Sequence, residues 1–403
     1  MIYLISILVF SGVIFTLVTV LLFVEAKVTS QGEHTVVINN DKEKPLNISG
    51  TPSLLSALSN QEIFLPSACG GSGSCGMCKC EVISGGGSIL PTELAHLSRR
   101  DKLSNIRLSC QLKVKEDLEI KIPESIFGIK KVNATVVSND NVATFIKELV
   151  LKPEIPMDFK AGAYIQIDVP EYDLAFKDFH IQSKYVSEWK KYNFLSLSAR
   201  GKKAGFRAYS LANPPHDNGI MMMNVRIATP PPGTASIPPG FGSSFIFGLK
   251  PGDHVQISGP YGDFLAKDTQ REMCFIGGGA GMAPLRSHIL NQLDGLHTKR
   301  KITFWYGARS KKEMFYDETF EDLDARYDNF SYHIALSSPD KEDNWTGLTG
   351  FIHTHLCSSY LCNHEDPTEI EYYLCGPPPM VDAIINALYD LGVEDDMIFY
   401  DKF

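Results

Sequence analysis

The stretch Cys69-Gly-Gly-Ser-Gly-Ser-Cys75-Gly-Met-Cys78 gathers three cysteines into one short loop, and Cys110 follows in the segment Leu-Ser-Cys-Gln-Leu. The 403-residue chain has nine cysteines, an odd number that is bunched rather than spread. This distribution does not indicate a disulfide framework; it indicates a metal site in a reducing compartment. Glycine and serine between the cysteines let the backbone wrap closely and direct N–H groups at sulfur atoms.

Four thiolates at this spacing are typical of a [2Fe–2S] cluster, and we predict that Cys69, Cys75, Cys78 and Cys110 bind one. Plant-type [2Fe–2S] proteins have four residues between the first two cysteines, whereas five separate them here. Four cysteines can also bind zinc, but structural zinc sites usually combine two short cysteine pairs, so zinc is the less favoured alternative. Nearby Cys80 is interpreted as a small buried side chain rather than a fifth ligand.

The residues around these cysteines predict a small α+β domain over 32–127. Strand-like segments lie at 35–38 and 46–48. A helix is expected to follow, with Thr51 as its N-cap and Pro52 in its first position.

An apolar segment precedes this domain, because residues 2–24 contain no charged side chain. At about 1.5 Å per residue it is long enough to span a hydrocarbon core of roughly 30 Å, which predicts a transmembrane anchor over 1–26. A signal peptide would need a basic start and a shorter apolar run, and a buried core helix would show a polar face. Basic residues follow the segment and none precedes it, so the later domains are expected in the cytoplasm.

Residues 128–268 predict an antiparallel β-barrel that binds a flavin. Strand-like segments occur at 132–137, 144–151 and 163–169. In Arg207-Ala-Tyr209-Ser210, strand alternation puts Arg207 and Tyr209 on one face and Ser210 on the other. Arginine suits a pyrophosphate, tyrosine can stack on the flavin ring, and Ser210 could hydrogen-bond near flavin N5, where a hydride arrives.

Two further features belong to this domain. The glycine- and serine-rich turn containing Gly242, Ser243 and Ser244 predicts a helix N-terminus that binds phosphate. The polar and aromatic stretch 171–192 has no regular pattern and is read as an insertion, either a solvated lobe or a docking surface for a partner.

Residues 269–403 predict an α/β domain with a parallel sheet. An apolar strand leads into Gly277-Gly-Gly-Ala-Gly281, where glycines would let the backbone approach a dinucleotide pyrophosphate. A later strand ends in Cys375-Gly376-Pro377, and ligands bind at the carboxyl ends of such strands. Cys375 could therefore touch a nicotinamide, although a lone cysteine can equally be a small buried side chain.

Taken together, Arg-Ala-Tyr-Ser, Gly-Gly-Gly-Ala-Gly-Met-Ala-Pro and Cys-Gly-Pro-Pro-Pro-Met resemble the ferredoxin–NADP⁺ reductase superfamily. The five-residue cysteine gap, the N-terminal apolar segment, Arg-Ala-Tyr-Ser-Leu-Ala-Asn and Ala-Thr-Pro-Pro-Pro-Gly resemble the F subunits of bacterial Na⁺-translocating NADH:quinone reductases over essentially the whole chain. The resemblance implies a ferredoxin-like β-grasp domain, an FAD barrel and an NADH-binding domain. It also implies partner subunits in the bacterial inner membrane, with ubiquinone as the final acceptor and sodium transport carried out by those partners.

The resemblance also assigns site residues. The cluster ligands are the four cysteines named above. FAD would be held by Arg207, Tyr209, Ser210, Gly242, Ser243 and Ser244. NADH would be held by Gly277, Gly278, Gly279, Ala280, Gly281, Cys375, Gly376 and Pro377. Ser210 and Cys375 are the expected catalytic residues.

Two alternative functions share many of these features. The reductase component of an oxygenase would have the same three domains but usually lacks the N-terminal span. A membrane-tethered iron–sulfur sensor would need neither flavin nor nucleotide. Nucleic acid is excluded as a partner, because the net charge is −9 and phosphate backbones require a basic face.

The choice of nucleotide is ambiguous in the sequence alone. The basic run from Arg309 through Ser310 and Lys311 to Lys312 follows a strand where a 2′-phosphate pocket could form. Glu313 and Asp317 follow closely, and the family resemblance indicates NADH, so NADH is predicted over NADPH.

Overall fold

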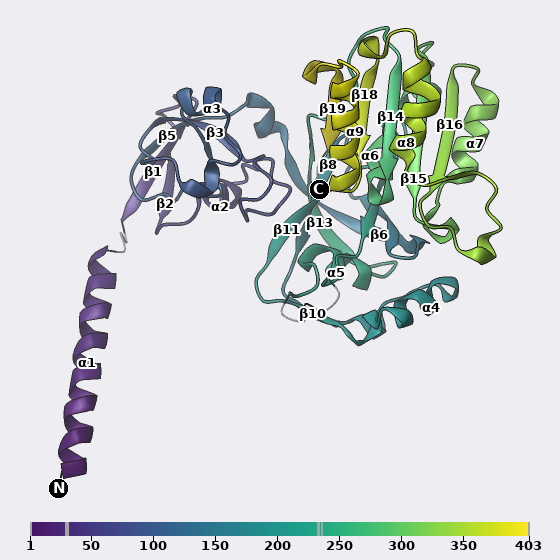
Figure 1. Cartoon of the computed structure of the whole chain (residues 1–403). Coiled ribbons are helices and arrows are strands. Elements are labelled where there is room, and N and C mark those ends of the chain that lie inside the picture. Colours follow the sequence, from purple (N-terminus) through teal and green to yellow (C-terminus); the bar gives the residue numbers. More distant parts are fainter. Residues whose placement is uncertain (1, 29–31, 232–233, 235–236, 402–403) are drawn as a thin grey trace. The chain divides into compact units, whose positions relative to one another are not determined.

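The computed structural model describes residues 2–28, 32–231, 234 and 237–401 (Figure 1). Met1, Lys402 and Phe403, which belong to the predicted anchor and nucleotide domain, lie outside the described residues. The chain separates into two compact units, Met1–Ile129 and Lys130–Phe403. The cysteine loop falls in the first unit, and the expected flavin and nucleotide residues fall in the second.

The N-terminal apolar segment forms helix α1 (Ile2–Val28). Apolar side chains such as Phe10, Phe15 and Leu21 are exposed along it. Over the residues that the structure describes, none of the helices combines the length and apolarity needed to cross a membrane. The helix expected over 2–24 is present, and its role as a membrane span stays a prediction.

The first unit contains a mixed sheet with the strand order β2-β1-β5-β3-β4. Its strands β1 and β5 are parallel, and its other pairs are antiparallel, as expected for a β-grasp sheet. Val36, Leu54 and Ile120 are fully buried between the sheet and helix α2. The elements are β1 (Glu33–Ile38), β2 (Leu46–Ser49), α2 (Leu54–Asn60), β3 (Lys79–Ser84), α3 (Arg99–Leu103), β4 (Ile106–Leu108) and β5 (Leu118–Lys121).

Helix α2 begins two residues later than the sequence predicts. Ser53 is its N-cap, and the Ser53 hydroxyl accepts a hydrogen bond from the Ser56 N–H. The assignment of Thr51 as the cap and Pro52 as the first helical residue was wrong, because serine at 53 satisfies a free N–H that Thr51 does not reach.

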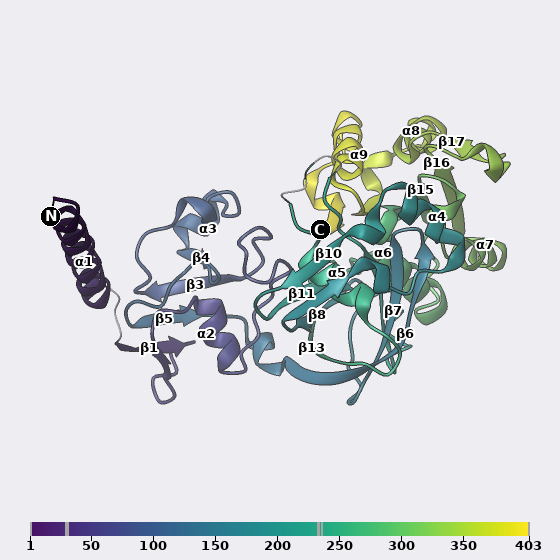
Figure 2. The same ribbon diagram turned by 90° about the horizontal axis from the view of Figure 1, so that it is seen from below.

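The second unit begins with an antiparallel sheet of order β11-β8-β13-β6-β7-β12. An isolated bridge between Leu211, which follows β11, and Met223 within β12 links the two outer strands. Helix α5 lies beside β11 (Figure 2). The elements are β6 (Lys130–Ala143), β7 (Ile146–Pro153), β8 (Tyr164–Val169), β11 (Gly205–Ser210), β12 (Met221–Arg226), α5 (Phe241–Gly248) and β13 (His254–Tyr261).

The insertion at 171–192 packs on the antiparallel sheet through a few aromatic side chains, whereas most of its other residues are exposed or partly exposed. The two readings of its sequence, a solvated lobe and a docking surface, both stay predictions. The insertion contains β9 (Tyr172–Ala175), which pairs with β10 (Ser198–Gly201), and helix α4 (Ser183–Lys191). Tyr185 and Trp189 lie four residues apart on one helix face and are buried in the same core as β6, β7 and β8.

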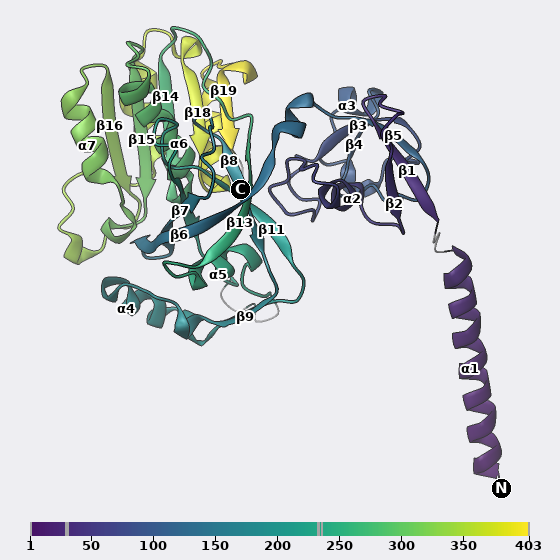
Figure 3. The ribbon, with the colours of Figure 1, turned by 180° about the vertical axis from the view of Figure 1, so that it is seen from behind.

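The remaining residues form a parallel sheet of order β17-β16-β15-β14-β18-β19. Side chains alternate between its faces: Phe275 packs with α6 and α7, whereas Ile276 packs with α8 and α9, and Figure 3 shows the side covered by α6 and α7. The elements are β14 (Met273–Gly278), α6 (Met282–Leu290), β15 (Ile302–Ala308), α7 (Asp317–Arg326), β16 (Phe330–Leu336), β17 (Leu348–Thr349), α8 (Ile352–His355), β18 (Glu371–Cys375), α9 (Pro378–Asp390) and β19 (Ile398–Asp401).

Candidate functional site

The cysteine loop runs between α2 and β3 and depends on glycine. Gly70, Gly71, Gly73 and Gly76 all have positive φ angles, which side chains other than glycine rarely adopt. A Cβ on Gly73 would also lie 2.5 Å from the Gln111 Nε2 atom. The loop therefore wraps closely against the segment that carries Cys110.

The four predicted ligands form two neighbouring sulfur pairs. Cys75 Sγ donates a hydrogen bond to Cys69 Sγ over 3.3 Å, which lowers the pKa of Cys69 and raises that of Cys75. The contact between Cys78 and Cys110 likewise raises the pKa of Cys78 and lowers that of Cys110. Charge on Cys69 also acts on Cys110, so the pairs are close to each other. Thiolates packed in this way suit a cationic iron–sulfur group.

The described part of the chain contains no group of three or more histidine, cysteine or acidic side chains arranged to hold a metal ion. Cys80 is buried, and its sulfur faces the Arg107 carbonyl over 3.8 Å, consistent with its interpretation as a small core residue.

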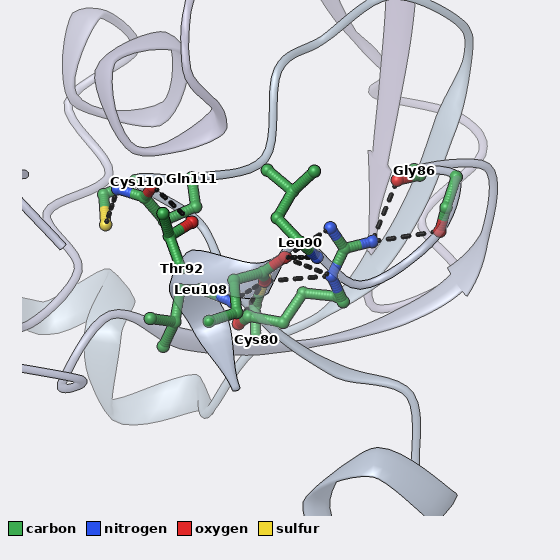
Figure 4. Close-up of polar contacts among 10 residues, drawn as sticks. Cys80, Gly86, Leu90, Thr92, Leu108, Cys110 and Gln111 are labelled. Atoms are coloured by element: carbon green, nitrogen blue, oxygen red, sulfur yellow. Dashed lines mark hydrogen bonds and ion pairs between the residues drawn. The ribbon is translucent and has the colours of Figure 1, made fainter. Parts of the chain in front are cut away.

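A buried ion pair supports the segment that carries Cys110 (Figure 4). The Arg107 guanidinium donates to the Glu93 carboxylate, with 2.7 Å between Nη2 and Oε2, and both side chains are almost fully buried. Glu93 also accepts the N–H groups of Leu90 and Leu108, and Arg107 donates to the Gly86 carbonyl. The pair thus ties the loop before α3 to strand β4, two residues before Cys110.

A second set of contacts reaches the sulfur itself (Figure 4). Thr92 Oγ1 donates to Gln111 Oε1 over 3.0 Å, which orients the Gln111 amide. Gln111 Nε2 then donates to Cys110 Sγ over 3.5 Å. Such N–H···S contacts stabilise negative charge on a cluster and raise its reduction potential.

The expected flavin residues come together between β11 and α5. A Cβ added to Gly242 would lie 2.5 Å from Arg207 Cγ and 2.7 Å from the Tyr209 hydroxyl. Ser243 is buried in the first turn of α5, where N–H groups lack intrahelical acceptors. Ser244 is buried beside it, and its N–H donates to the Gly240 carbonyl over 3.0 Å. An arginine beside a helix N-terminus fits a pyrophosphate.

Ser210 faces away from these residues, as strand alternation predicts. Its hydroxyl donates to Asp401 Oδ2 over 3.0 Å. Burial raises the pKa of Asp401 to about 6 and the pKa of Cys375 well above its usual value. Asp401 pairs in register with Cys375 across β18 and β19, so a serine, a carboxyl and a thiol meet where the two sheets approach.

The two predicted nucleotide turns lie side by side at the carboxyl ends of β14 and β18. Gly277 pairs in register with Cys375, and a Cβ on Gly281 would lie 2.1 Å from the Cys375 carbonyl oxygen. Gly279 has a φ of 57°. The chain leaves β14 towards β15 on one side and returns as β18 on the other, the point where open α/β sheets bind ligands.

A cavity of about 600 Å³ opens beside these turns. Of the predicted residues, Gly278, Gly279 and Pro377 line it, as do Arg309, Ser310, Lys312 and Glu313. The sequence prediction missed Arg226 at the end of β12 and Glu188, Lys191 and Tyr192 of the insertion. These residues come from segments far from the glycine turns, and the sequence carries no local signal that would place them there.

Three family models match the chain. A 2Fe-2S iron-sulfur cluster binding domain matches residues 37–115. An oxidoreductase FAD-binding domain matches residues 187–265, and an oxidoreductase NAD-binding domain matches residues 275–385. The cysteine loop lies inside the first match, Arg207–Ser210 of β11 inside the second, and the turns at Gly277–Gly281 and Cys375–Pro377 inside the third.

Two curated relatives cover almost the whole chain. The F subunit of the Na(+)-translocating NADH-quinone reductase of Neisseria gonorrhoeae is 54% identical over 402 residues, which are 99% of this chain and 98% of the relative. The corresponding F subunit of Mannheimia succiniciproducens is 53% identical over 398 residues, which are 98% of this chain and 97% of the relative.

Two solved structures share the fold. The Amycolatopsis cytochrome P450 reductase GcoB has a TM-score of 0.66 and 24% identity, and the alignment covers 92% of this chain and 98% of GcoB. The ferredoxin reductase in carbazole 1,9a-dioxygenase has a TM-score of 0.61 and 26% identity, with the same coverage.

Proposed function

This chain belongs to the family of F subunits of Na(+)-translocating NADH-quinone reductases, and on that premise we propose how its residues carry out the electron-input step. It is an oxidoreductase with FAD-binding, NAD-binding and [2Fe–2S] domains, and it feeds electrons from NADH to an iron–sulfur centre. The observation that carries the residue-level proposal is the hydrogen bond from Ser210 on β11 of the antiparallel sheet to Asp401 on β19 of the parallel sheet.

We assign the four clustered cysteines to the [2Fe–2S] group. Arg207 and the first turn of α5, with Gly242, Ser243 and Ser244, would hold the FAD pyrophosphate, and Tyr209 would lie against the flavin. When bound, FAD accepts a hydride and the cluster passes electrons on singly.

The remaining residues position the nucleotide. The turn Gly277–Gly281 would admit the pyrophosphate, and Gly376 and Pro377 would form the opposite wall. A Cβ at Gly281 would collide with the Cys375 carbonyl, so glycine at this position lets the two turns pack together. Ser210, held by Asp401, would direct its hydroxyl oxygen to the reacting edge of the flavin. Cys375, fully buried at the end of β18, would exclude water beside the nicotinamide.

We also propose that α1 attaches the chain to the inner membrane as a single-pass anchor, with the later domains cytoplasmic and the chain held against the other subunits and their quinone. The charge-free sequence of residues 2–24 and the lysines that follow it support this assignment. The exposed apolar side chains of α1, among them Phe10 and Phe15, support it further.

The proposal is tested with the purified full-length chain. NADH should bleach the flavin, and ferricyanide, a one-electron acceptor, should then be reduced continuously. A chain that binds FAD but is not reduced by NADH would contradict it. An oxygenase reductase component would pass the same test, but quinone reduction with sodium uptake in the assembled complex separates the two functions.

A further inference from the structure

The insertion at 171–192 forms one wall of the nucleotide cavity. Glu188, Lys191 and Tyr192 line this cavity together with Thr144 and Phe145 from the turn between β6 and β7. Helix α4 is fixed to that turn, because Trp189 Nε1 donates to the Thr144 carbonyl over 2.7 Å. It is also fixed to the end of β6, because the Tyr185 hydroxyl donates to the Val142 carbonyl over 3.1 Å. Glu188 is therefore presented to the cavity by a rigid element.

Glu188 engages the basic segment on the opposite wall. Lys312 Nζ lies 3.6 Å from Glu188 Oε1 and 3.4 Å from Asp340 Oδ2. Lys191 Nζ lies 3.3 Å from the other Glu188 oxygen. Exposed ion pairs of this kind contribute little to stability. These ion pairs instead place two carboxylates around a lysine that lines the cavity.

The position of Lys312 in the sheet indicates which part of a bound dinucleotide would lie beside it. Lys312 follows β15, the second strand of the parallel sheet, and in such folds this region contacts the adenosine ribose. A carboxylate there suits a free 2′-hydroxyl, whereas a cation there suits a 2′-phosphate. Lys312 is flanked by Glu188 and Asp340, so a 2′-phosphate beside Lys312 would meet carboxylates and an occupied lysine. Arg226 and Arg309 also line the cavity, and the charges of both act on Glu313.

We propose that Glu188, which the insertion supplies, is a specificity-determining residue that selects NADH over NADPH by keeping Lys312 from a 2′-phosphate. The inference rests on the proposed function, since it concerns the nucleotide of the same site. It also explains why the run from Arg309 to Lys312 looks suited to NADPH in the sequence but is compatible with NADH in the fold.

The test is the ratio of kcat/KM for NADPH to kcat/KM for NADH in the full-length protein. In Glu188→Gln this ratio should rise by roughly tenfold, the gain expected when a charged group acquires a phosphate partner. Adenosine 2′-monophosphate should inhibit the variant more strongly than wild type, and added salt should shrink the difference. Asp178→Asn is the matched control, because this exposed carboxylate belongs to the same insertion and does not line the cavity.

A second variant separates a direct effect from a general change in charge. Adding Lys312→Met to Glu188→Gln should abolish the gain with NADPH. The proposal is overturned if Glu188→Gln leaves the ratio unchanged, if Asp178→Asn raises it equally, or if the gain survives without Lys312. A wild-type protein that fails to oxidise NADH would instead overturn the proposed function.

Discussion

The Ser210 hydroxyl on β11 donates a hydrogen bond to the Asp401 carboxylate on β19, although 191 residues separate the two in the sequence. The contact joins the strand that carries the expected flavin residues to the strand beside Cys375. A serine hydroxyl has one O–H to donate. Because this O–H is directed at Asp401, the oxygen lone pairs face a neighbouring ligand as acceptors. The carboxyl therefore fixes the orientation of the predicted catalytic serine.

The protonation of Asp401 should control flavin reduction. Burial raises its pKa to about 6, so above this pH the ionised carboxylate accepts the hydrogen bond from the Ser210 hydroxyl, and below this pH the carboxyl is protonated. The rate of flavin bleaching by NADH should fall as the pH drops through about 6, and Asp401→Asn should remove this inflection. Stopped-flow absorbance checks both points, and an inflection that persists in Asp401→Asn would assign it to another group.

The raised pKa of Asp401 should also make the free energy of unfolding depend on pH, in the direction opposite to the rate of flavin reduction. The folded-state pKa lies above the usual value of 3.8, so the folded chain binds the extra proton between these values. The contribution of Asp401 to the free energy of unfolding should therefore decrease as the pH rises from about 4 to about 6. Asp401→Asn should flatten that part of the stability profile.

The Gln111 amide should tune the cluster. Gln111→Leu removes the N–H donated to Cys110 Sγ and should lower the reduction potential by roughly 40 mV, which corresponds to about 1 kcal/mol for a one-electron couple. Thr92→Val should shift it in the same direction by less, because it only frees the amide to rotate. Gln61→Leu, an exposed change in the same unit, is the control. Equal potentials in the wild type and Gln111→Leu would exclude this role.

Trp189 should hold the insertion in place. It is fully buried, and its ring packs near Phe145, Phe176 and Phe247. Trp189→Ala should lower the free energy of unfolding of the second unit by about 3–5 kcal/mol, measured by urea denaturation. Trp345→Ala, at a partly exposed tryptophan, should cost about 1 kcal/mol. Equal losses in the two variants would mean that α4 is only loosely attached.

Membrane attachment makes a separate prediction. If α1 is an anchor with the later domains cytoplasmic, the protein should remain with the membrane after a salt wash. Protease added to intact cells or right-side-out vesicles should leave the domains whole, and protease added to inside-out vesicles should cut them. Digestion from the outside would contradict the orientation, and release by salt alone would contradict the anchor.

The sequence predicts best those features that short segments determine. The cysteine loop and the turn at Gly277–Gly281 are recognisable because glycine spacing and strand ends are local properties. Asp401, Arg226 and Glu188 escaped prediction because each reaches its site through folding from a distant segment. The helix start moved from Thr51 to Ser53 because neighbouring hydroxyl residues offer similar caps, and only the backbone path chooses between them.

The insertion shows a further limit. Its buried aromatic residues are divided between short elements: a turn buries Phe176 and Phe179, and α4 buries Tyr185 and Trp189. Two residues in each element give too short a pattern to predict burial from the sequence. Trp189 and Phe176 are nevertheless fully buried. Patternless polar and aromatic sequence therefore does not by itself indicate a solvated lobe.

We propose that hydride entry and single-electron exit use separate parts of the chain. Cys110→Ala removes one of four proposed thiolate ligands and should abolish the cluster. The flavin and nucleotide residues lie in the other compact unit, so FAD should stay bound. Ser210→Ala should do the reverse, slowing flavin reduction while the visible and EPR signals of the cluster remain.

The most direct measurement compares two rates in Cys110→Ala assembled with its partner subunits: flavin bleaching by NADH and electron delivery to quinone. We expect flavin bleaching close to the wild-type rate and a collapse of quinone reduction. A normal cluster spectrum with normal quinone reduction would contradict the assignment of Cys110 as a ligand, and loss of flavin bleaching with FAD still bound would contradict the order of the carriers.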